Sequence, residues 1–176
     1  MDESRDLLAA QLKAGDRTAA EELVEMYYQQ IYRYMRRLGH GRQTSEDLTQ
    51  ESFLQAWCRI NQLRNGWMLG AWLYGIATNI SRLYLRRHKD DEKTGLKSDD
   101  VPDSNIGSDN VSRDEQLELL KRTLEKLPMK LKETVVLHYM QQLAISDAAE
   151  AAGVREGTFK RRLNRALKAL RGQVIR

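Results

Sequence analysis

Apolar side chains recur every three or four residues along most of the chain, which is the spacing of an amphipathic helix. The pattern predicts helices over about residues 4–14, 17–38, 44–60, 71–88, 112–127, 131–142, 146–152 and 157–171. The period-two alternation of half-buried strands does not appear, and only 2 prolines interrupt the 176 residues. The sequence therefore predicts an all-α protein.

Polar residues and glycines predict where the second and third helices begin and end. Asp16 or Thr18 is expected to cap the second helix, and Thr44 is expected to start the third. The segment Gly39-His40-Gly41 should end the second helix, because glycine readily adopts the left-handed conformation that follows a helix C-terminus.

Residues 89–111 separate the predicted helices into two groups and differ from them in composition. Residues 88–112 hold 7 acidic and 3 basic side chains, with few apolar residues to bury. Such a segment is typical of a flexible acidic linker. The next helix should open with the capping box of Ser112 and Glu115. The sequence thus predicts two small helical domains, residues 1–88 and 112–176, joined by residues 89–111.

Several classes of site are not supported by the composition. The single cysteine, Cys58, excludes an internal disulfide and a cysteine-based zinc cluster, and the three histidines lack metal-ligand spacing. Asp47 and Glu51 form a carboxylate pair four residues apart, but no third ligand on that helix completes a metal site. We therefore expect no metal, no cofactor and no catalytic residues.

The N-terminus lacks the hydrophobic core of a signal peptide, and no run approaches 18 apolar residues. These two features predict a cytoplasmic protein that does not insert into a membrane.

The predicted helix at 44–60 carries a regular polar row opposite its apolar residues. The row consists of Asp47, Gln50, Glu51 and Gln55. The residues expected to face the core are Leu48, Phe53, Leu54, Ala56 and Trp57. An exposed acidic and amide row is a candidate docking surface for a basic partner, although an ordinary solvated helix face would have the same pattern.

The last predicted helix has one apolar and one basic face. Within about 100° of arc lie Phe159, Leu163, Ala166, Leu167 and Leu170. The other side carries Lys160, Arg161, Asn164, Arg165 and Lys168. A short alanine-rich helix and the turn Gly153-Val154-Arg155 precede it, as in a helix-turn-helix whose second helix enters the major groove of DNA. The alternative is a solvated basic face on a bundle helix.

Four segments, taken in order, resemble bacterial RNA polymerase sigma factors of the extracytoplasmic-function group, within the sigma-70 family. The segments are Leu12–Asp16, Glu46–Phe53, Ala71–Asn79, and Leu127-Pro128 together with Gly153–Lys160. The resemblance covers nearly the whole chain. It implies an alternative sigma factor that binds core RNA polymerase, directs it to a two-part promoter and assists promoter melting.

The resemblance also implies roles for particular residues. Contact with the coiled coil of the largest polymerase subunit is implied for Asp47, Gln50 and Glu51. Contact with the minus-ten element is implied for Trp67, Asn79, Arg82, Arg86 and Arg87. Reading of the minus-thirty-five element is implied for Lys160, Arg161, Asn164, Arg165 and Lys168. An anti-sigma factor is a further implied partner, and no small-molecule substrate is implied.

Two rival classes of protein share some of these features. A two-domain transcriptional regulator would explain the basic last helix, but not the acidic row or the segment 72–79. A DNA-cutting or recombining enzyme would need a nucleophile or a metal constellation, and none is visible in the sequence. We therefore expect an initiation factor that is not itself an enzyme.

Some positions depart from the pattern of the sigma factors that the chain resembles. Gly75 stands where an arginine is common, Leu83 replaces a usual aspartate, and Arg161 replaces a small residue at a base-reading position. The promoter sequence therefore does not follow from the resemblance.

Overall fold

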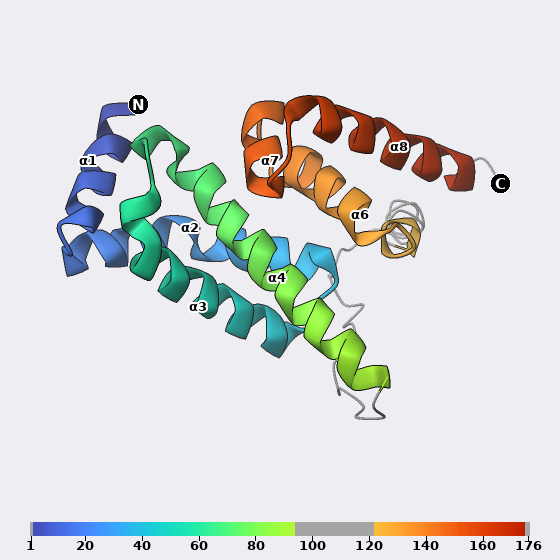
Figure 1. Cartoon of the computed structure of the whole chain (residues 1–176), viewed down its shortest axis with the longest axis horizontal. Coiled ribbons are helices and arrows are strands. Elements are labelled where there is room, and N and C mark those ends of the chain that lie inside the picture. Colours follow the sequence, from blue (N-terminus) through green and yellow to red (C-terminus); the bar gives the residue numbers. More distant parts are fainter. Residues whose placement is uncertain (1, 94–121, 175–176) are drawn as a thin grey trace, which may run out of the picture.

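The protein's structure is a computed structural model that describes residues 2–93 and 122–174. Within these residues every regular element is a helix, and none is a strand (Figure 1). The predicted all-α fold is confirmed.

The N-terminal unit is a bundle in which α2, α3 and α4 pack on one another. Its α-helices are α1 (Asp2–Lys13), α2 (Arg17–Leu38), α3 (Arg42–Arg59) and α4 (Leu69–Lys93). Two short 3-10 helices, η1 (Ile60–Gln62) and η2 (Gly66–Met68), connect α3 to α4, and α1 packs against both (Figure 1).

The predicted helix ends are right for α2 and wrong for the start of α3. Asp16 caps α2, since its Oδ1 accepts a hydrogen bond of 2.9 Å from the backbone N–H of Thr18. Gly39 ends α2 in the left-handed conformation, with φ of 105°. Helix α3 begins two residues before Thr44, and its N-cap is Gly41, which has no side chain with which to cap.

Helix α4 extends beyond its predicted bounds at both ends. It begins at Leu69 and continues to Lys93, so residues 89–93 of the expected linker belong to this helix. The rest of that linker and the predicted capping box at Ser112 lie outside the described residues.

The C-terminal unit ends in a helix-turn-helix. After a helical turn at residues 122–125 come α6 (Met129–Val135), the π-helical segment η3 (Val136–Met140), α7 (Ile145–Ala152) and α8 (Glu156–Val174). Gly153, with φ of 66°, makes the predicted turn between α7 and α8. The helix expected over 131–142 is instead split, because the backbone N–H of Gln141 bonds five residues back to Val136 and the chain then turns left-handed at Gln142.

The main core crosses from one unit to the other. Helices α2 and α4 bury most of their apolar stripes in it, and Tyr34 meets Tyr74 edge to face with ring centroids 5.4 Å apart. The C-terminal unit adds Val136, Leu137 and Phe159, together with four alanines of α7. Consequently α7 lies directly against α4, as Figure 1 shows.

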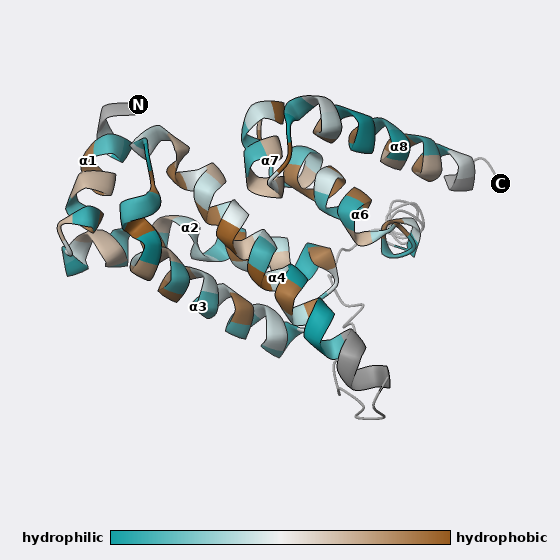
Figure 2. Cartoon of the chain, in the orientation of Figure 1, coloured by the Kyte–Doolittle hydropathy of each residue, from teal (hydrophilic) through white to brown (hydrophobic). Residues whose placement is uncertain are grey.

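A smaller cluster holds the C-terminal unit together on its own side. It consists of Leu124, Leu127, Val135, Leu163, Ala166 and Leu170. The opposite side of α8 is hydrophilic along most of its length (Figure 2). The two faces predicted for the last helix are therefore confirmed.

Candidate partner and nucleic-acid interfaces

The polar row predicted on α3 faces outward in the structure. Asp47, Gln50 and Glu51 are exposed, whereas Gln55 is half-buried. The inward face of the helix carries Ser45, Leu48, Thr49, Ser52 and Ala56. Thr49 and Ser52 each donate a hydrogen bond of 2.6 Å to the carbonyl four residues earlier, so their hydroxyls are satisfied within the helix.

Two apolar residues predicted for the core side of α3 lie outside it. The side chain of Leu54 is 68% exposed and that of Trp57 is 39% exposed. At about 100° per residue, Leu54 projects within the arc that Gln50, Asp47 and Glu51 span. The small residues of α3 take the core positions instead, because α2 and α4 both pack closely against that face.

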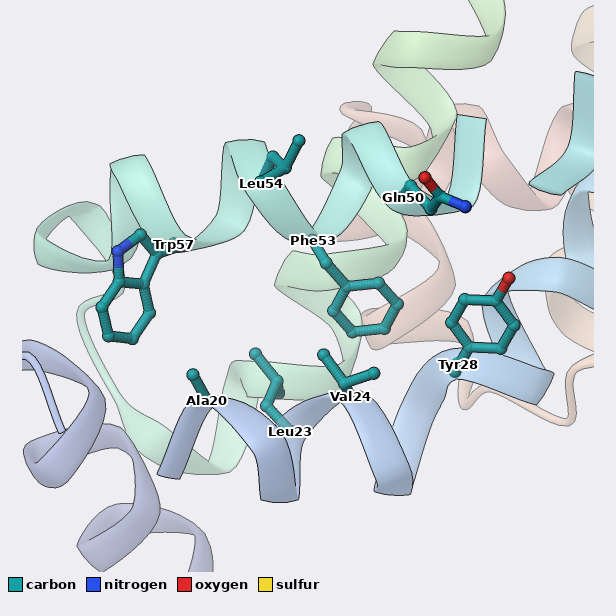
Figure 3. Close-up of a pocket in the computed structure, with 8 residues that line it drawn as sticks. All are labelled: Ala20, Leu23, Val24, Tyr28, Gln50, Phe53, Leu54 and Trp57. Atoms are coloured by element: carbon teal, nitrogen blue, oxygen red, sulfur yellow. The ribbon is translucent and has the colours of Figure 1, made fainter. Parts of the chain in front are cut away.

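These misplaced residues line a groove that the sequence reasoning missed. The groove lies between α2 and α3, has a volume of about 400 Å³, and is lined mainly by Leu23, Val24, Tyr28, Phe53, Leu54 and Trp57 (Figure 3). The sequence feature that could have revealed the groove is the presence, on both α2 and α3, of apolar residues outside the buried stripe of the helix.

Acidic residues lie near the groove on both helices. Glu21 and Glu25 line a neighbouring hollow on α2 that shares Ala20 and Val24 with the groove, and Asp47 and Glu51 are exposed on α3. An apolar channel with acidic residues nearby fits an amphipathic helix whose apolar anchors are flanked by basic residues.

The turn that carries Trp67 is held in place by its neighbours. Trp67 is 49% exposed in η2, while Leu63 and Leu69 on either side of it are buried. A Cβ added to Gly66 would lie 2.5 Å from the Asp6 Cα and 2.7 Å from the Arg5 carbonyl oxygen, so the backbone of α1 touches this turn. The packing of α1 therefore holds the backbone of this turn in place, while the ring of Trp67 remains accessible to solvent.

Trp67 and Asn79 do not converge on one point. Both side chains are exposed, but Asn79 lies ten residues into α4, which at 1.5 Å per residue is about 15 Å from the start of the helix. Trp72 is half-buried and Tyr74 is buried, so Trp67 is the more accessible aromatic residue of this region. Two groups this far apart would contact different nucleotides of one strand.

The three arginines of α4 have different surroundings. Arg86 and Arg87 are exposed. Arg82 instead forms a two-pronged ion pair with Glu133 of α6, with Nε–Oε1 of 2.9 Å and Nη2–Oε2 of 2.6 Å. The hydrogen bonds that Arg82 donates to Glu133 raise the pKa of Arg82, although partial burial opposes this. The ion pair therefore joins Arg82 of the N-terminal unit to the C-terminal unit.

The basic face of α8 is open to solvent. Its exposed side chains are Lys160, Arg161, Asn164, Arg165 and Lys168. Glu156 lies 3.6 Å from the Nζ of Lys160, and the Nε of Arg161 donates a 3.3 Å bond to the Gly157 carbonyl. Both contacts are at the surface, where they hold the side chains only weakly.

The described residues contain no group of three or more histidine, cysteine, aspartate or glutamate side chains that could hold a metal ion. No helix of the described part is long and apolar enough to cross a membrane.

Comparison with known proteins accounts for both helical units. Residues 23–90 match Sigma-70 region 2, and residues 117–170 match Sigma-70 region 4. The ECF RNA polymerase sigma factor SigW of Bacillus subtilis is 30% identical over 174 residues, which cover 93% of each chain. The chain belongs to the ECF RNA polymerase sigma factors.

Further relatives and solved structures agree with this family. The ECF sigma factor SigM of Bacillus subtilis is 29% identical, over 86% of this chain and 92% of that protein. CnrH, solved with the cytosolic domain of CnrY, superimposes with a TM-score of 0.72 at 23% identity, covering 97% of each chain. RpoE of Bartonella quintana, solved with the anti-sigma factor NepR, gives 0.66 at 22% identity, covering 88% of this chain and 95% of that one. At these identities the two structures support the shared fold.

As an ECF sigma factor, the protein directs RNA polymerase to specific promoters in transcription initiation. The family resemblance and the function predicted from sequence are confirmed. The matches to both sigma-70 regions favour this function over the rival hypotheses of a DNA-binding regulator and a DNA-cutting enzyme. The match to region 2 begins at residue 23, so it does not include helix α1. This helix nevertheless packs on the turn that carries Trp67.

The contact between α1 and Gly66 predicts the effect of a single added methyl group. Gly66→Ala should lower the free energy of unfolding by about 1–3 kcal/mol, because the new Cβ overlaps the backbone of α1 and forces it to shift. Thermal denaturation followed by circular dichroism measures the change.

Gly172→Ala is the matched control, since its Cβ would meet no described heavy atom within 4 Å. This change in α8 should be neutral or stabilise by up to about 1 kcal/mol. Equal stability of the Gly66→Ala variant and the unaltered protein would contradict the tight packing of α1 on the turn.

Proposed function

We propose that this sigma factor docks on core RNA polymerase through the outward face of α3, melts the minus-ten element with α4 and its preceding turn, and reads the minus-thirty-five element with α8. The observation that carries the proposal is the separation of an acidic, groove-bearing surface on α3 from a basic helix-turn-helix. One surface suits a basic protein partner and the other suits DNA.

The docking surface combines charge with an apolar anchor site. Asp47, Gln50 and Glu51 attract a basic coiled coil of the polymerase, and Leu54 in the same arc offers apolar contact. The adjoining groove accepts side chains of the partner, which contribute more to affinity than exposed ion pairs do. The long-range attraction between the acidic row and a basic coiled coil raises the rate of association.

The proposed melting surface consists of Trp67, Asn79, Arg86 and Arg87. These residues supply an aromatic ring for stacking, an amide and two positive charges. An unstacked base can stack on Trp67, and such stacking returns part of the free energy spent in opening the duplex. Asn79 can hydrogen-bond a second base, while Arg86 and Arg87 neutralise the phosphates of the same strand. This part of the protein supplies binding free energy to the open state of DNA.

On the basic face of α8, base contacts and phosphate contacts are proposed for different residues. Residues near the start of a recognition helix meet base edges, so Arg161 and Asn164 suit base reading. Lys160, Arg165 and Lys168 suit phosphate contacts, which fix the register of the helix on the duplex.

The partners set the remaining features of the proposal. The polymerase performs the chemistry, so this protein acts as an initiation factor and not as an enzyme, and polymerase and chromosome are both met in the cytoplasm. An anti-sigma factor is a further expected partner, since the similar RpoE of Bartonella quintana was solved in complex with the anti-sigma factor NepR.

Reversing charge on α3 tests the docking surface. The double change Asp47→Lys plus Glu51→Lys should abolish binding to purified core polymerase in a pull-down, because like charges would then face each other. Both side chains are exposed, so the melting temperature should change little.

Glu22→Lys is the control, since Glu22 is exposed on α2 about 200° around that helix from the groove residue Val24. This variant should bind core polymerase normally. Unchanged binding by the double variant would show that the polymerase docks elsewhere.

Changes at Trp67 and Asn79 test the melting surface. Trp67→Ala and Asn79→Ala should each slow promoter opening by holoenzyme on duplex DNA while leaving activity on a pre-melted template nearly intact. Trp67→Phe should retain most of the activity, because a phenyl ring still stacks on a base. Run-off transcription on both templates measures the effect, and equal defects on the two would mean that the residues serve only the fold.

Arg161→Ala and Lys168→Ala test how α8 docks on DNA. Loss of a base contact at Arg161 should cost about 1–3 kcal/mol and relax preference at one base pair. Loss of a phosphate contact at Lys168 should weaken all sequences alike and reduce the salt slope by about one unit. Binding to a panel of minus-thirty-five variants at several salt concentrations separates the two, and a uniform loss for Arg161→Ala would make that arginine a phosphate clamp.

A further inference from the structure

Two glycines lie on either side of Trp67 in the segment that begins α4, and the backbone of α1 packs against the first of them. A Cβ added to Gly66 would lie 2.5 Å from the Asp6 Cα and 2.7 Å from the Arg5 carbonyl oxygen. Helix α1 is itself anchored on the bundle by three buried side chains, those of Leu8, Ala9 and Leu12. The turn therefore rests on a helix that is fixed to the core.

A side chain of α2 packs against the second glycine. A Cβ added to Gly70 would lie 3.2 Å from the Oη of Tyr27 and 3.4 Å from its Cε1, so the edge of the phenol ring covers the start of α4. Burial raises the pKa of the Tyr27 hydroxyl, and the positive charge of Arg5 on α1 partly opposes this. Tyr27 thus lies where α1, α2 and the start of α4 meet.

The backbone of the turn is hydrogen-bonded, while its tryptophan is accessible. The N–H of Met68 donates a 3.1 Å bond to the Asn65 carbonyl, and the N–H of Leu69 donates to the Gly66 carbonyl. Leu69 is completely buried, whereas Trp67 is 49% exposed. Buried neighbours and internal hydrogen bonds are features of a segment that opens only rarely.

A turn that is already ordered changes the free energy of base capture. Each flexible residue that had to be ordered during capture would lower the population of the open complex about 5–30-fold. In this protein the entropy of ordering the turn is lost during folding, through the contacts of α1 and Tyr27. A binding group that is held in place before its ligand arrives binds more tightly for this reason.

We propose that α1 and Tyr27 are positioning elements for promoter melting, which hold the turn of Trp67 ready to capture an unstacked base. Neither element needs to touch DNA, because each acts through the tryptophan. The inference rests on the proposed role of Trp67 in stacking. It gives a function to α1, which the match to region 2 does not include.

Two substitutions loosen the turn from opposite sides. Gly66→Ala forces the turn and the backbone of α1 apart, and Tyr27→Leu removes the ring edge that covers Gly70. Tyr27→Phe is the conservative variant, because it keeps that edge. Leu38→Ala is the control for lost stability, since Leu38 is buried on α2 but lies eleven residues, or about 16 Å, beyond Tyr27.

Amide hydrogen exchange in the free, full-length protein measures how firmly the turn is held. The amides of Met68 and Leu69 are compared with that of Ile31, which is buried at the centre of α2 and reports global unfolding. Relative to Ile31, the turn amides should exchange about tenfold faster in Gly66→Ala and Tyr27→Leu than in the unaltered protein. The ratio should not change in Tyr27→Phe or Leu38→Ala. Exchange of the turn at the rate of an unstructured peptide in the unaltered protein would overturn the proposal.

Promoter opening by holoenzyme gives the second readout, followed by the fluorescence of 2-aminopurine placed in the minus-ten element. Gly66→Ala and Tyr27→Leu should slow opening about 5–30-fold, whereas Tyr27→Phe and Leu38→Ala should stay within about twofold of the unaltered protein. A pre-melted template should restore activity only in part, because the open state still needs the ordered turn.

A double-mutant cycle distinguishes positioning from a general loss of structure. In a Trp67→Ala background, Gly66→Ala and Tyr27→Leu should slow opening no further, because the ring through which they act is gone. Additional slowing of the same size in that background would show that α1 and Tyr27 serve only the fold. Normal opening by both variants in the presence of Trp67 would equally overturn the positioning role.

Failure of this inference differs from failure of the proposed melting role. If Trp67→Ala itself opens promoters normally, the melting role fails and the positioning role fails with it, whatever the exchange rates show. If Trp67→Ala is defective but the two loosening variants are not, the positioning role alone fails. These variants alter different elements, so a folding defect in one, detected by circular dichroism, leaves the other to decide.

Discussion

The packing of α4 against its neighbours is the constraint on which the rest of the structure depends. This helix contacts α2, α3, α7 and the η2 turn, and its residues Ala77, Thr78 and Ser81 are completely buried. Small side chains at these positions let three helices approach one backbone. Because Trp67 precedes α4 and Asn79 and the arginines lie on it, the position of every proposed minus-ten contact follows from this packing.

The polar groups inside that contact are paired with one another. Tyr34 and Thr78 lie 2.8 Å apart, and the Thr78 hydroxyl donates to the Tyr74 carbonyl at 2.7 Å. Burial raises the pKa of Tyr34, with Glu133 as the second cause, which reflects how close the C-terminal unit lies to the centre of the N-terminal bundle. Buried hydroxyls that are hydrogen-bonded in this way specify one alignment of the helices, because any other alignment would leave them unsatisfied.

Sequence patterns were most informative where a helix has one solvent-exposed side and one buried side. The arcs of α8 were predicted correctly, since Phe159 and Leu163 alternate with exposed cations at helical spacing. The pattern failed for Leu54 and Trp57 on α3, because periodicity shows that two residues share a face but not which face meets the neighbours. Small hydroxyl residues such as Thr49 and Ser52 took the core side, and the apolar groove beside the acidic row was missed as a result.

The sequence by itself determined the helical fold, the cap at Asp16, the turn at Gly153, the polar row of α3 and the family. These features depend on local spacing and on short motifs, which neighbouring residues suffice to encode. Only the tertiary structure decided that α1 supports the Trp67 turn and that Arg82 meets Glu133, 51 residues further along the chain. Such pairings depend on how whole helices approach one another, and the free energy of that approach is spread over many small contacts that no single motif records.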